Sequence, residues 1–251
     1  MLVLPFGITR LLSGIAFCLG LVLVVVGGAE LFTGNALISM AWASGMVSTR
    51  QVLRNWSIVY TGNLIGALVT AVFLYFSRQY TFGGGAVGLT ALEIARAKTD
   101  LGFMQAVVLG ILCNALVCLA VWLCLGARST ADKILSIVFP ISAFVAAGFE
   151  HSVANMYFIP LGLLIKTDTA FLTTISRSAA DYASLTWTNF LLVNLLPVTL
   201  GNLIGGVVLV GLTYWFIYLR PERALVPASP HPPLAQHPSA PTEVDADGRQ
   251  D

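Results

Sequence analysis

The segment Asn55–Leu68 reads NWSIVYTGNLIGAL and the segment Asn194–Val207 reads NLLPVTLGNLIGGV, so the string GNLIG occurs twice. Upstream of each copy lies an apolar stretch with a break, and each break holds one acidic residue, Glu30 or Glu150. The order of broken helix, loop and GNLIG helix is therefore repeated along the chain. This repeat predicts a protein built from two similar halves.

The relative direction of the two halves follows from counting membrane crossings. One unbroken apolar helix, Phe103–Leu125, opens the second unit, and we expect an equivalent helix to open the first. That helix is missing from the sequence, because Met1 lies only a few residues before the first broken helix, so five of the six expected helices are present. The GNLIG helices are then the third and sixth crossings and run in opposite directions. We predict an all-α membrane protein, aquaporin-like, in which three-helix units form an inverted repeat with two broken helices.

The composition independently requires a lipid environment. Of the 251 residues, 57% are hydrophobic and 10% are charged, and the mean hydropathy is +0.85. Soluble domains carry about 25% charged residues, and a chain this apolar would expose large adhesive patches in water. Nucleic acid binding calls for a basic face, and the net charge of +1 does not suggest one, so we predict no nucleic acid partner.

The apolar stretches define the expected crossings, because a membrane helix needs about 20 apolar residues. Three stretches are long enough alone: Val52–Phe76, Phe103–Leu125 and Phe190–Leu219. Two others are broken, with pieces that are each short for a span: Leu11–Val26 with a continuation to Ala43, and Ile134–Ala147 with the continuation Ser152–Ile165. We therefore assign residues 1–220 to a transmembrane pore domain. Residues 221–251 form a proline-rich tail with few large apolar side chains, which we expect to be disordered.

Three ionisable residues are predicted to lie at membrane depth: Glu30, Glu150 and His151. Charge there is costly and marks a pathway or a partner. For the two glutamates we favour a structural role, in which each carboxylate binds backbone N–H groups freed by the helix break. His151 is the one histidine outside the tail, and imidazole can donate to an anion and change protonation near neutral pH. Thr33 lies in the other break, where its hydroxyl suits a small oxyanion or a simple helix cap.

The cysteines give no redox or metal signal. Cys18, Cys113, Cys118 and Cys124 all lie inside apolar stretches, and no pair has CxxC spacing. We interpret them as small core residues. No second histidine or cysteine lies near His151 in the sequence, so we predict neither a metal site nor a cofactor.

Four segments resemble the signatures of the formate–nitrite transporter family: GGAELFTGNAL, NWSIVYTGNLIGAL, GFEHSVANMYFIPLG and NLLPVTLGNLIGGVVLVGLTYWFIYLR. The resemblance covers roughly Pro5 to Arg220, and the string MYFIPLG is closer to the formate branch than to the nitrite branch. It implies a homopentamer in the bacterial inner membrane, multi-pass, with one pore in each protomer. The chain differs from the family in having five rather than six membrane helices.

The same resemblance implies roles for individual residues. Thr33 and His151 match the central pair that binds the anion, and Lys98 matches a basic residue at the periplasmic approach. Polar residues that support the histidine region correspond to Asn114, Glu150 and Asn202. Apolar constriction residues on the two sides of the central pair correspond to Phe17 and Phe144 and to Leu21, Leu31, Phe32 and Val117.

These roles suggest a transport mechanism for formate. Lys98 draws the anion in, and the apolar constrictions resist a bare charge because its desolvation is costly. His151 then either stabilises the anion, which gives a channel, or lends it a proton, which gives formate/H⁺ symport. Nitrite is the nearest alternative substrate, followed by hydrosulfide or lactate.

Three other classes of function fit the sequence less well. A membrane enzyme would need a cluster of acid, base or metal ligands, whereas one histidine and two glutamates lie on separate segments. A purely structural subunit would have no reason to keep two matched helix breaks with polar residues. Water and glycerol channels carry paired NPA motifs, and this chain has none.

Overall fold

The computed structural model describes residues 4–220, so the predicted disorder of residues 221–251 concerns a segment outside the described residues. Within that range every secondary-structure element is a helix, and there is no strand. The first half comprises α1 (Phe6–Gly27), η1 (Gly34–Leu37), α2 (Ile38–Ala43), α3 (Thr49–Phe76), η2 (Gln79–Thr81) and α4 (Ala86–Thr99). The second half comprises α5 (Phe103–Leu125), α6 (Thr130–Ala147), α7 (Ser152–Lys166), α8 (Thr169–Thr174), η3 (Ala179–Tyr182), η4 (Asn189–Leu195), α9 (Leu196–Leu203), η5 (Ile204–Leu212) and η6 (Trp215–Leu219).

Both predicted breaks are present, and each follows a glycine in the left-handed region. α1 ends at Gly28 with φ 75°, and α6 ends at Gly148 with φ 77°. A side chain in that conformation is strained, which explains glycine at both positions. One expectation was wrong: the first piece is 22 residues rather than 16, because helix α1 begins at Phe6, and α1 and α6 are each long enough by themselves to cross a membrane. The described part of the chain holds five such helices.

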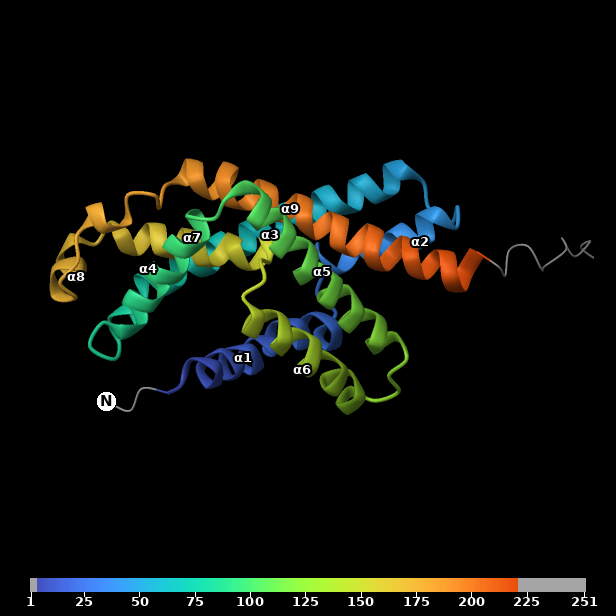
Figure 1. The fold of residues 1–251 in the computed structure, drawn as a ribbon, viewed down its shortest axis with the longest axis horizontal. Coiled ribbons are helices and arrows are strands. Elements are labelled where there is room, and N and C mark those ends of the chain that lie inside the picture. Colours follow the sequence, from blue (N-terminus) through green and yellow to red (C-terminus); the bar gives the residue numbers. More distant parts are fainter. Residues whose placement is uncertain (1–3, 221–251) are drawn as a thin grey trace, which may run out of the picture.

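The helices pack in two groups (Figure 1): α1 and α6 form one, and the other long helices form the second. α1 makes its most extensive contacts with α6, and α6 also packs on α5. α3 and α4 pack on α7, and α5 packs on the last helix. We use "α4 side" for the end of the molecule where α3 finishes and α5 starts, and "α2 side" for the opposite end. α1 begins on the α4 side and runs toward the middle of the molecule (Figure 1).

Close packing between two helices explains the glycines of the second GNLIG copy. A Cβ at Gly201 would lie 2.2 Å from the carbonyl oxygen of Val107, and one at Gly205 would lie 2.2 Å from that of Ile111. α5 and the last helix therefore approach backbone to backbone, as small residues allow in membrane helix pairs. The last helix, 189–219, is mostly π-helical, with one α-helical segment, α9.

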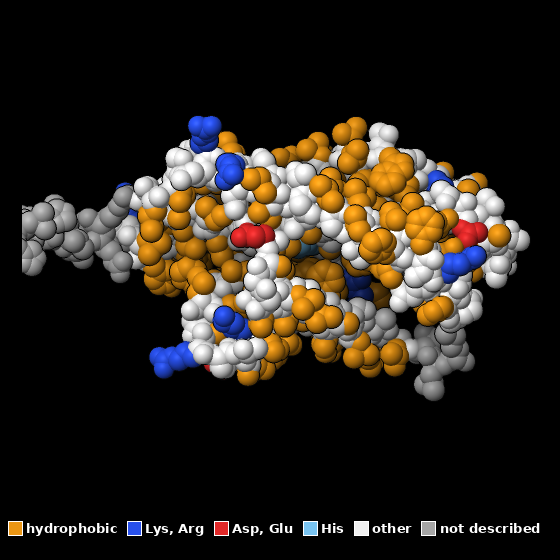
Figure 2. Space-filling view, turned by 180° about the vertical axis from the view of Figure 1, so that it is seen from behind, with side chains coloured by type: hydrophobic (Ala, Val, Ile, Leu, Met, Phe, Trp, Pro, Cys, Tyr) orange, Lys and Arg blue, Asp and Glu red, His pale blue; other side chains and the backbone are white. Residues whose placement is uncertain are grey.

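The outer surface is apolar, as a lipid-facing surface should be. Large side chains such as Phe76, Leu125 and Phe139 are at least 70% exposed. Figure 2 shows hydrophobic side chains spread over one face, with most of the charged side chains toward the two ends and a hollow in the middle in which Lys or Arg atoms are visible. Buried polar side chains, by contrast, include Thr33, Asn114, Glu150, His151, Asn155, Asn194 and Asn202.

Candidate functional site

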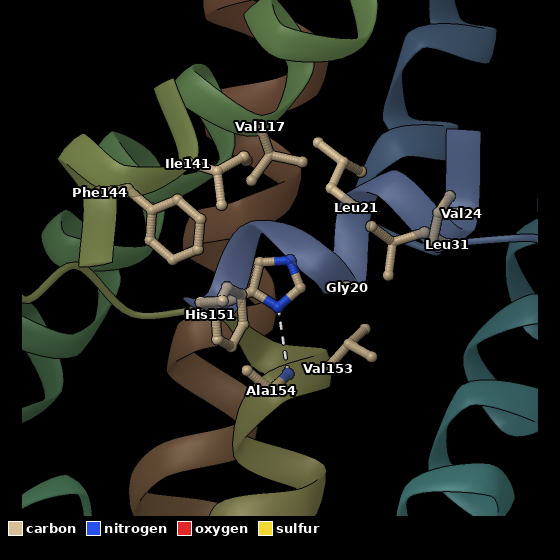
Figure 3. Close-up of a pocket in the computed structure, with 11 residues that line it drawn as sticks. Gly20, Leu21, Val24, Leu31, Val117, Ile141, Phe144, His151, Val153 and Ala154 are labelled. Carbon is tan, nitrogen blue, oxygen red and sulfur yellow. Dashed lines mark hydrogen bonds between the residues drawn. The ribbon is translucent and has the colours of Figure 1, made fainter. Parts of the chain in front are cut away.

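A cavity of about 170 Å³ lies between the two broken helices. Helices α1, α5, α6 and α7 and the first break line it with the following residues: Phe17, Gly20, Leu21, Val24, Leu31, Val117, Ile141, Phe144, His151, Val153 and Ala154. Figure 3 shows His151 pointing into this space from the second break, with apolar side chains around it. The cavity wall is thus almost entirely apolar, and His151 provides its polar side chain.

Thr33 and His151 form the polar centre of the site. The two breaks meet here, and Thr33 Oγ1 lies 2.9 Å from His151 Nε2. Both side chains are buried, with exposed fractions of 1% for Thr33 and 6% for His151. The structure therefore brings together two residues that lie 118 positions apart in the sequence.

The hydrogen bonds of His151 determine its tautomer. His151 is the N-cap of α7, and the backbone N–H of Ala154 donates to His151 Nδ1 over 3.1 Å (Figure 3). Because Nδ1 accepts, the proton of the neutral ring is on Nε2, which donates to Thr33 Oγ1. The Thr33 hydroxyl is left with its own proton to donate. Thr33 itself is not among the residues that line the cavity, and it adjoins the cavity through its bond to His151.

Aromatic and aliphatic side chains line the cavity beside this pair. The rings of Phe17 and Phe144 meet edge to face with centroids 5.6 Å apart, and Phe144 stacks on His151 at 6.0 Å. Five of the six predicted constriction residues line the cavity: Phe17, Leu21, Leu31, Val117 and Phe144. Phe32 does not, because its ring packs instead against Trp56 and Tyr60. The lining also includes residues that the sequence analysis did not identify: Gly20, Val24, Ile141, Val153 and Ala154.

Lys98 and Glu150 lie together behind the second break. Lys98 Nζ is 2.8 Å from Glu150 Oε1, and the side chains are 15% and 7% exposed. The second carboxylate oxygen, Oε2, accepts from Asn155 over 2.7 Å and from Asn194 over 3.4 Å. The positive charge of Lys98 is therefore matched by a neighbouring carboxylate.

The predicted role of the glutamates as caps for freed backbone N–H groups was wrong. Both carboxylates bind side chains, since Glu30 accepts from Asn35 and Glu150 accepts from Lys98 and Asn155. The freed backbone is bound by the asparagines of the GNLIG strings. A carboxamide can accept from an N–H and donate to a C=O at once, which an ionised carboxylate cannot do.

Asn202 and Asn114 hold the two breaks in place. Asn202 accepts from the N–H of Ser152 over 2.9 Å and donates to the carbonyl of Glu150 over 3.0 Å. Asn114 donates to the carbonyl of Thr33 over 3.1 Å and to that of Asn202 over 2.7 Å. Both predicted supporting asparagines thus lie beside the central pair. Asn114 bonds the backbone of Thr33, and Asn202 bonds the backbone of Glu150 and Ser152, the two neighbours of His151 in the sequence.

Five further asparagines belong to the same network and were not identified from the sequence: Asn35, Asn55, Asn63, Asn155 and Asn194. The sequence did carry a signal for them. Each break contains an acid followed five positions later by an asparagine, and each repeat contains two asparagines eight positions apart. Aligning the two halves on these spacings would have identified the entire set.

No group of three or more His, Cys, Asp or Glu side chains within residues 4–220 could hold a metal ion. The fold and site define a class: a multi-pass helical membrane protein whose inverted repeat encloses an apolar cavity with one polar centre.

The comparisons with known proteins identify the family. The sequence model described as "Formate/nitrite transporter" matches residues 2–216, and the chain belongs to this family. It is 48% identical over 219 residues to "Formate channel FocA" of Escherichia coli (strain K12), covering 86% of this chain and 77% of the relative. It is 42% identical over 209 residues to "Formate channel FocA" of Haemophilus influenzae, covering 82% and 74%.

Solved structures agree with this assignment. A "Pentameric formate channel with formate bound" superposes with a TM-score of 0.81 at 46% identity, covering 86% of each chain. An "FNT family ion channel" gives a TM-score of 0.71 at 33% identity, covering 86% of this chain and 80% of that one. The relatives are channels and transporters, so the chain is a transport protein and not an enzyme. The predicted family and its formate branch are confirmed.

Proposed function

We propose that this protein carries formate across the bacterial inner membrane, as a homopentamer with one pore in each protomer. The observation that carries the proposal is the buried Thr33–His151 hydrogen bond at the wall of an otherwise apolar cavity. Formate is small enough for such a cavity and accepts hydrogen bonds through both oxygens. The names of the relatives support the substrate, and a pentameric relative supports the assembly.

In this proposal the anion passes between two apolar constrictions and is stabilised at the centre. Phe17 and Phe144 form the constriction on the α4 side, and Leu21, Leu31 and Val117 form the other. Crossing either one costs desolvation energy, because apolar side chains cannot replace the water around a charge. The Thr33 hydroxyl offsets part of that cost by donating to the anion, while His151 Nε2–H orients the hydroxyl.

The geometry of His151 favours the channel mode over proton symport. Lending a proton would require the imidazolium form, with protons on both ring nitrogens. Protonation of Nδ1 would remove the bond from the Ala154 N–H and place positive charge at the N-terminus of α7, which the helix dipole disfavours. Formate/H⁺ symport remains the alternative mode. It predicts a pH-dependent direction of flow that His151→Ala abolishes, and unchanged pH dependence in that variant would exclude it.

The direct test is uptake of labelled formate into proteoliposomes at several pH values, with nitrite as competitor. Strong formate flux that nitrite inhibits weakly is the expected result. The family name includes nitrite, so nitrite is the second candidate substrate, with hydrosulfide and lactate behind it. If nitrite or hydrosulfide is carried and formate is not, the assignment of a pore stands and the assignment of formate as the substrate is wrong.

A further inference from the structure

Arg10 continues the stripe of α1 that lines the cavity. The stripe consists of Phe17, Leu21 and Val24, and Arg10 lies seven residues before Phe17 on the same helix. Seven residues are close to two helical turns, so Arg10 lies on nearly the same face as Phe17, about 10 Å along the axis. It is therefore placed beyond the Phe17–Phe144 constriction, on the α4 side.

The guanidinium of Arg10 lies against the second helix break. Its Nε donates to the carbonyl of Ala146, in the last turn of α6, over 3.2 Å. A Cβ built on Gly148 would lie only 2.7 Å from Arg10 Nη2. The Arg10 side chain is thus half-buried and is held along one edge by the second break. Gly148, which it contacts, lies three residues before His151.

The remaining N–H groups of Arg10 make no hydrogen bond within residues 4–220, although the guanidinium also lies over the ring of Phe6, with its Cζ 5.9 Å from the ring centroid. Arg10 makes no other side-chain hydrogen bond there, and no carboxylate lies within ion-pair distance of it. Lys98 differs, because its charge is paired with Glu150 at 2.8 Å. Arg10 therefore carries a positive charge that no carboxylate of the described residues neutralises, on the α4 side of the Phe17–Phe144 pair.

We propose that Arg10 is an entrance site for a small monovalent carboxylate on the α4 side of the pore. This inference rests on the proposed function and names the residue that receives the anion first. The planar guanidinium presents paired N–H groups that match the two oxygens of a carboxylate. The bond from Nε to Ala146 fixes the plane of the group, so that the Nη edge is left for the anion.

The experiment measures formate influx into proteoliposomes of fixed orientation, with formate added on the α4 side or on the α2 side. The variants are Arg10→Met and Arg10→Lys, and the matched control is Arg54→Met, an exposed arginine of α3 on the α2 side. Each variant is first shown to have the oligomeric state and unfolding temperature of the wild type. Labelled formate is the probe throughout.

Arg10→Met should raise the half-saturating formate concentration about tenfold for influx from the α4 side, with little change in maximal flux, because it loses a charge-assisted contact. Arg10→Lys keeps the charge without the fork and should raise it about threefold. Added salt should raise the half-saturating formate concentration of the wild type, because salt screens the charge of Arg10. The half-saturating concentration of Arg10→Met should change little, because that variant lacks this charge. Arg54→Met should behave as the wild type.

Several outcomes would overturn the proposal. An unchanged half-saturating concentration in Arg10→Met would do so, as would a loss of maximal flux alone, which indicates a structural role at the helix break. An equal change for influx from both sides would also contradict an entrance site. Failure of the wild type itself to carry formate would instead overturn the proposed function, and the two failures are therefore distinguishable.

Discussion

Asn63 and Asn202 make the same pair of backbone hydrogen bonds in the two halves of the protein. Asn63 accepts from the N–H of Phe32 over 2.9 Å and donates to the carbonyl of Glu30 over 3.0 Å. Asn202 accepts from Ser152 and donates to Glu150 over the same two distances. Each GNLIG asparagine therefore holds the helix break of its own half open, so that the broken backbone is satisfied without water.

Asn202→Ala should destabilise the protein substantially. Asn202 is fully buried, and its loss leaves the N–H of Ser152 and the carbonyls of Glu150 and Gly110 without this partner. Each buried group left unpaired costs about 1–3 kcal/mol. The measurement is thermal unfolding in detergent.

The matched control is Asn189→Ala, which removes one bond to the carbonyl of Ser184 near the surface. It should cost no more than about 1 kcal/mol, because water can replace that bond. Equal unfolding temperatures for Asn202→Ala and Asn189→Ala would contradict the structural role given to Asn202.

Thr33→Val should reduce formate flux while leaving the fold intact. Valine has nearly the shape of threonine but lacks the hydroxyl that bonds to His151. Without it, the anion loses its donor and His151 Nε2–H loses its acceptor, so flux should fall about tenfold, equivalent to one lost hydrogen bond to a charged group. Thr33→Ser keeps the hydroxyl and is the control. The proteoliposome assay compares the two, and full flux in Thr33→Val would show that the hydroxyl does not act on the anion.

His151→Asn should separate the structural role of His151 from its role in transport. Asparagine is a good N-cap, so its side-chain oxygen can replace Nδ1 as the acceptor for the Ala154 N–H. It is too short to reach Thr33, and we expect the flux to fall while stability stays near that of the wild type. His151→Ala should lose the cap as well and cost about 1 kcal/mol more. Unfolding temperature and flux are measured on both variants, and equal stability of the two would rule out the cap.

Much of this site was predictable because its chemistry is local to the breaks. Glycine, an acid and Thr33 or His151 within a few residues of an apolar run already indicate where a membrane helix stops and a pathway begins. The contact between Thr33 and His151 followed from the family resemblance, since residues 118 positions apart meet only through tertiary packing.

The errors have physical causes. The glutamates were expected to bind backbone because a break frees N–H groups, but the GNLIG asparagines from another helix meet both the freed donor and the freed acceptor. Phe32 is not among the residues that line the cavity, since its ring packs against Trp56 and Tyr60 on α3, and its place at a constriction stays a prediction. Arg10 was not identified because an arginine near the end of an apolar helix is ordinary in sequence, and its contact with Ala146 appears only in the fold.

The last prediction concerns Asp168, which lies outside the membrane-spanning segments and joins η2 to α8. The Tyr80 hydroxyl donates to Asp168 over 2.6 Å, and this bond, together with the N–H of Phe171 and the nearby Arg78, lowers the pKa of Asp168. Burial, with the carboxylate beside it, raises the pKa of Tyr80 to about 12, so the tyrosine remains a donor at all physiological pH values. Because the pKa of Asp168 is lower in the folded state than in the unfolded state, its contribution to stability is present above the unfolded pKa and is lost as the pH falls through the folded value.

Asp168→Asn should therefore lower the unfolding temperature at neutral pH, and the difference from the wild type should shrink as the pH falls below about 4, the ordinary pKa of aspartate. Tyr80→Phe removes the largest cause of the shift and should move this loss of stability to higher pH. The control is Asp100→Asn, an exposed aspartate with no side-chain hydrogen bond or ion pair in the described structure. Unfolding temperature is followed in detergent from pH 7 to about pH 3, a range that spans the ordinary aspartate pKa. A difference between Asp168→Asn and the wild type that stays constant over this range would show that the charge of Asp168 does not stabilise the fold.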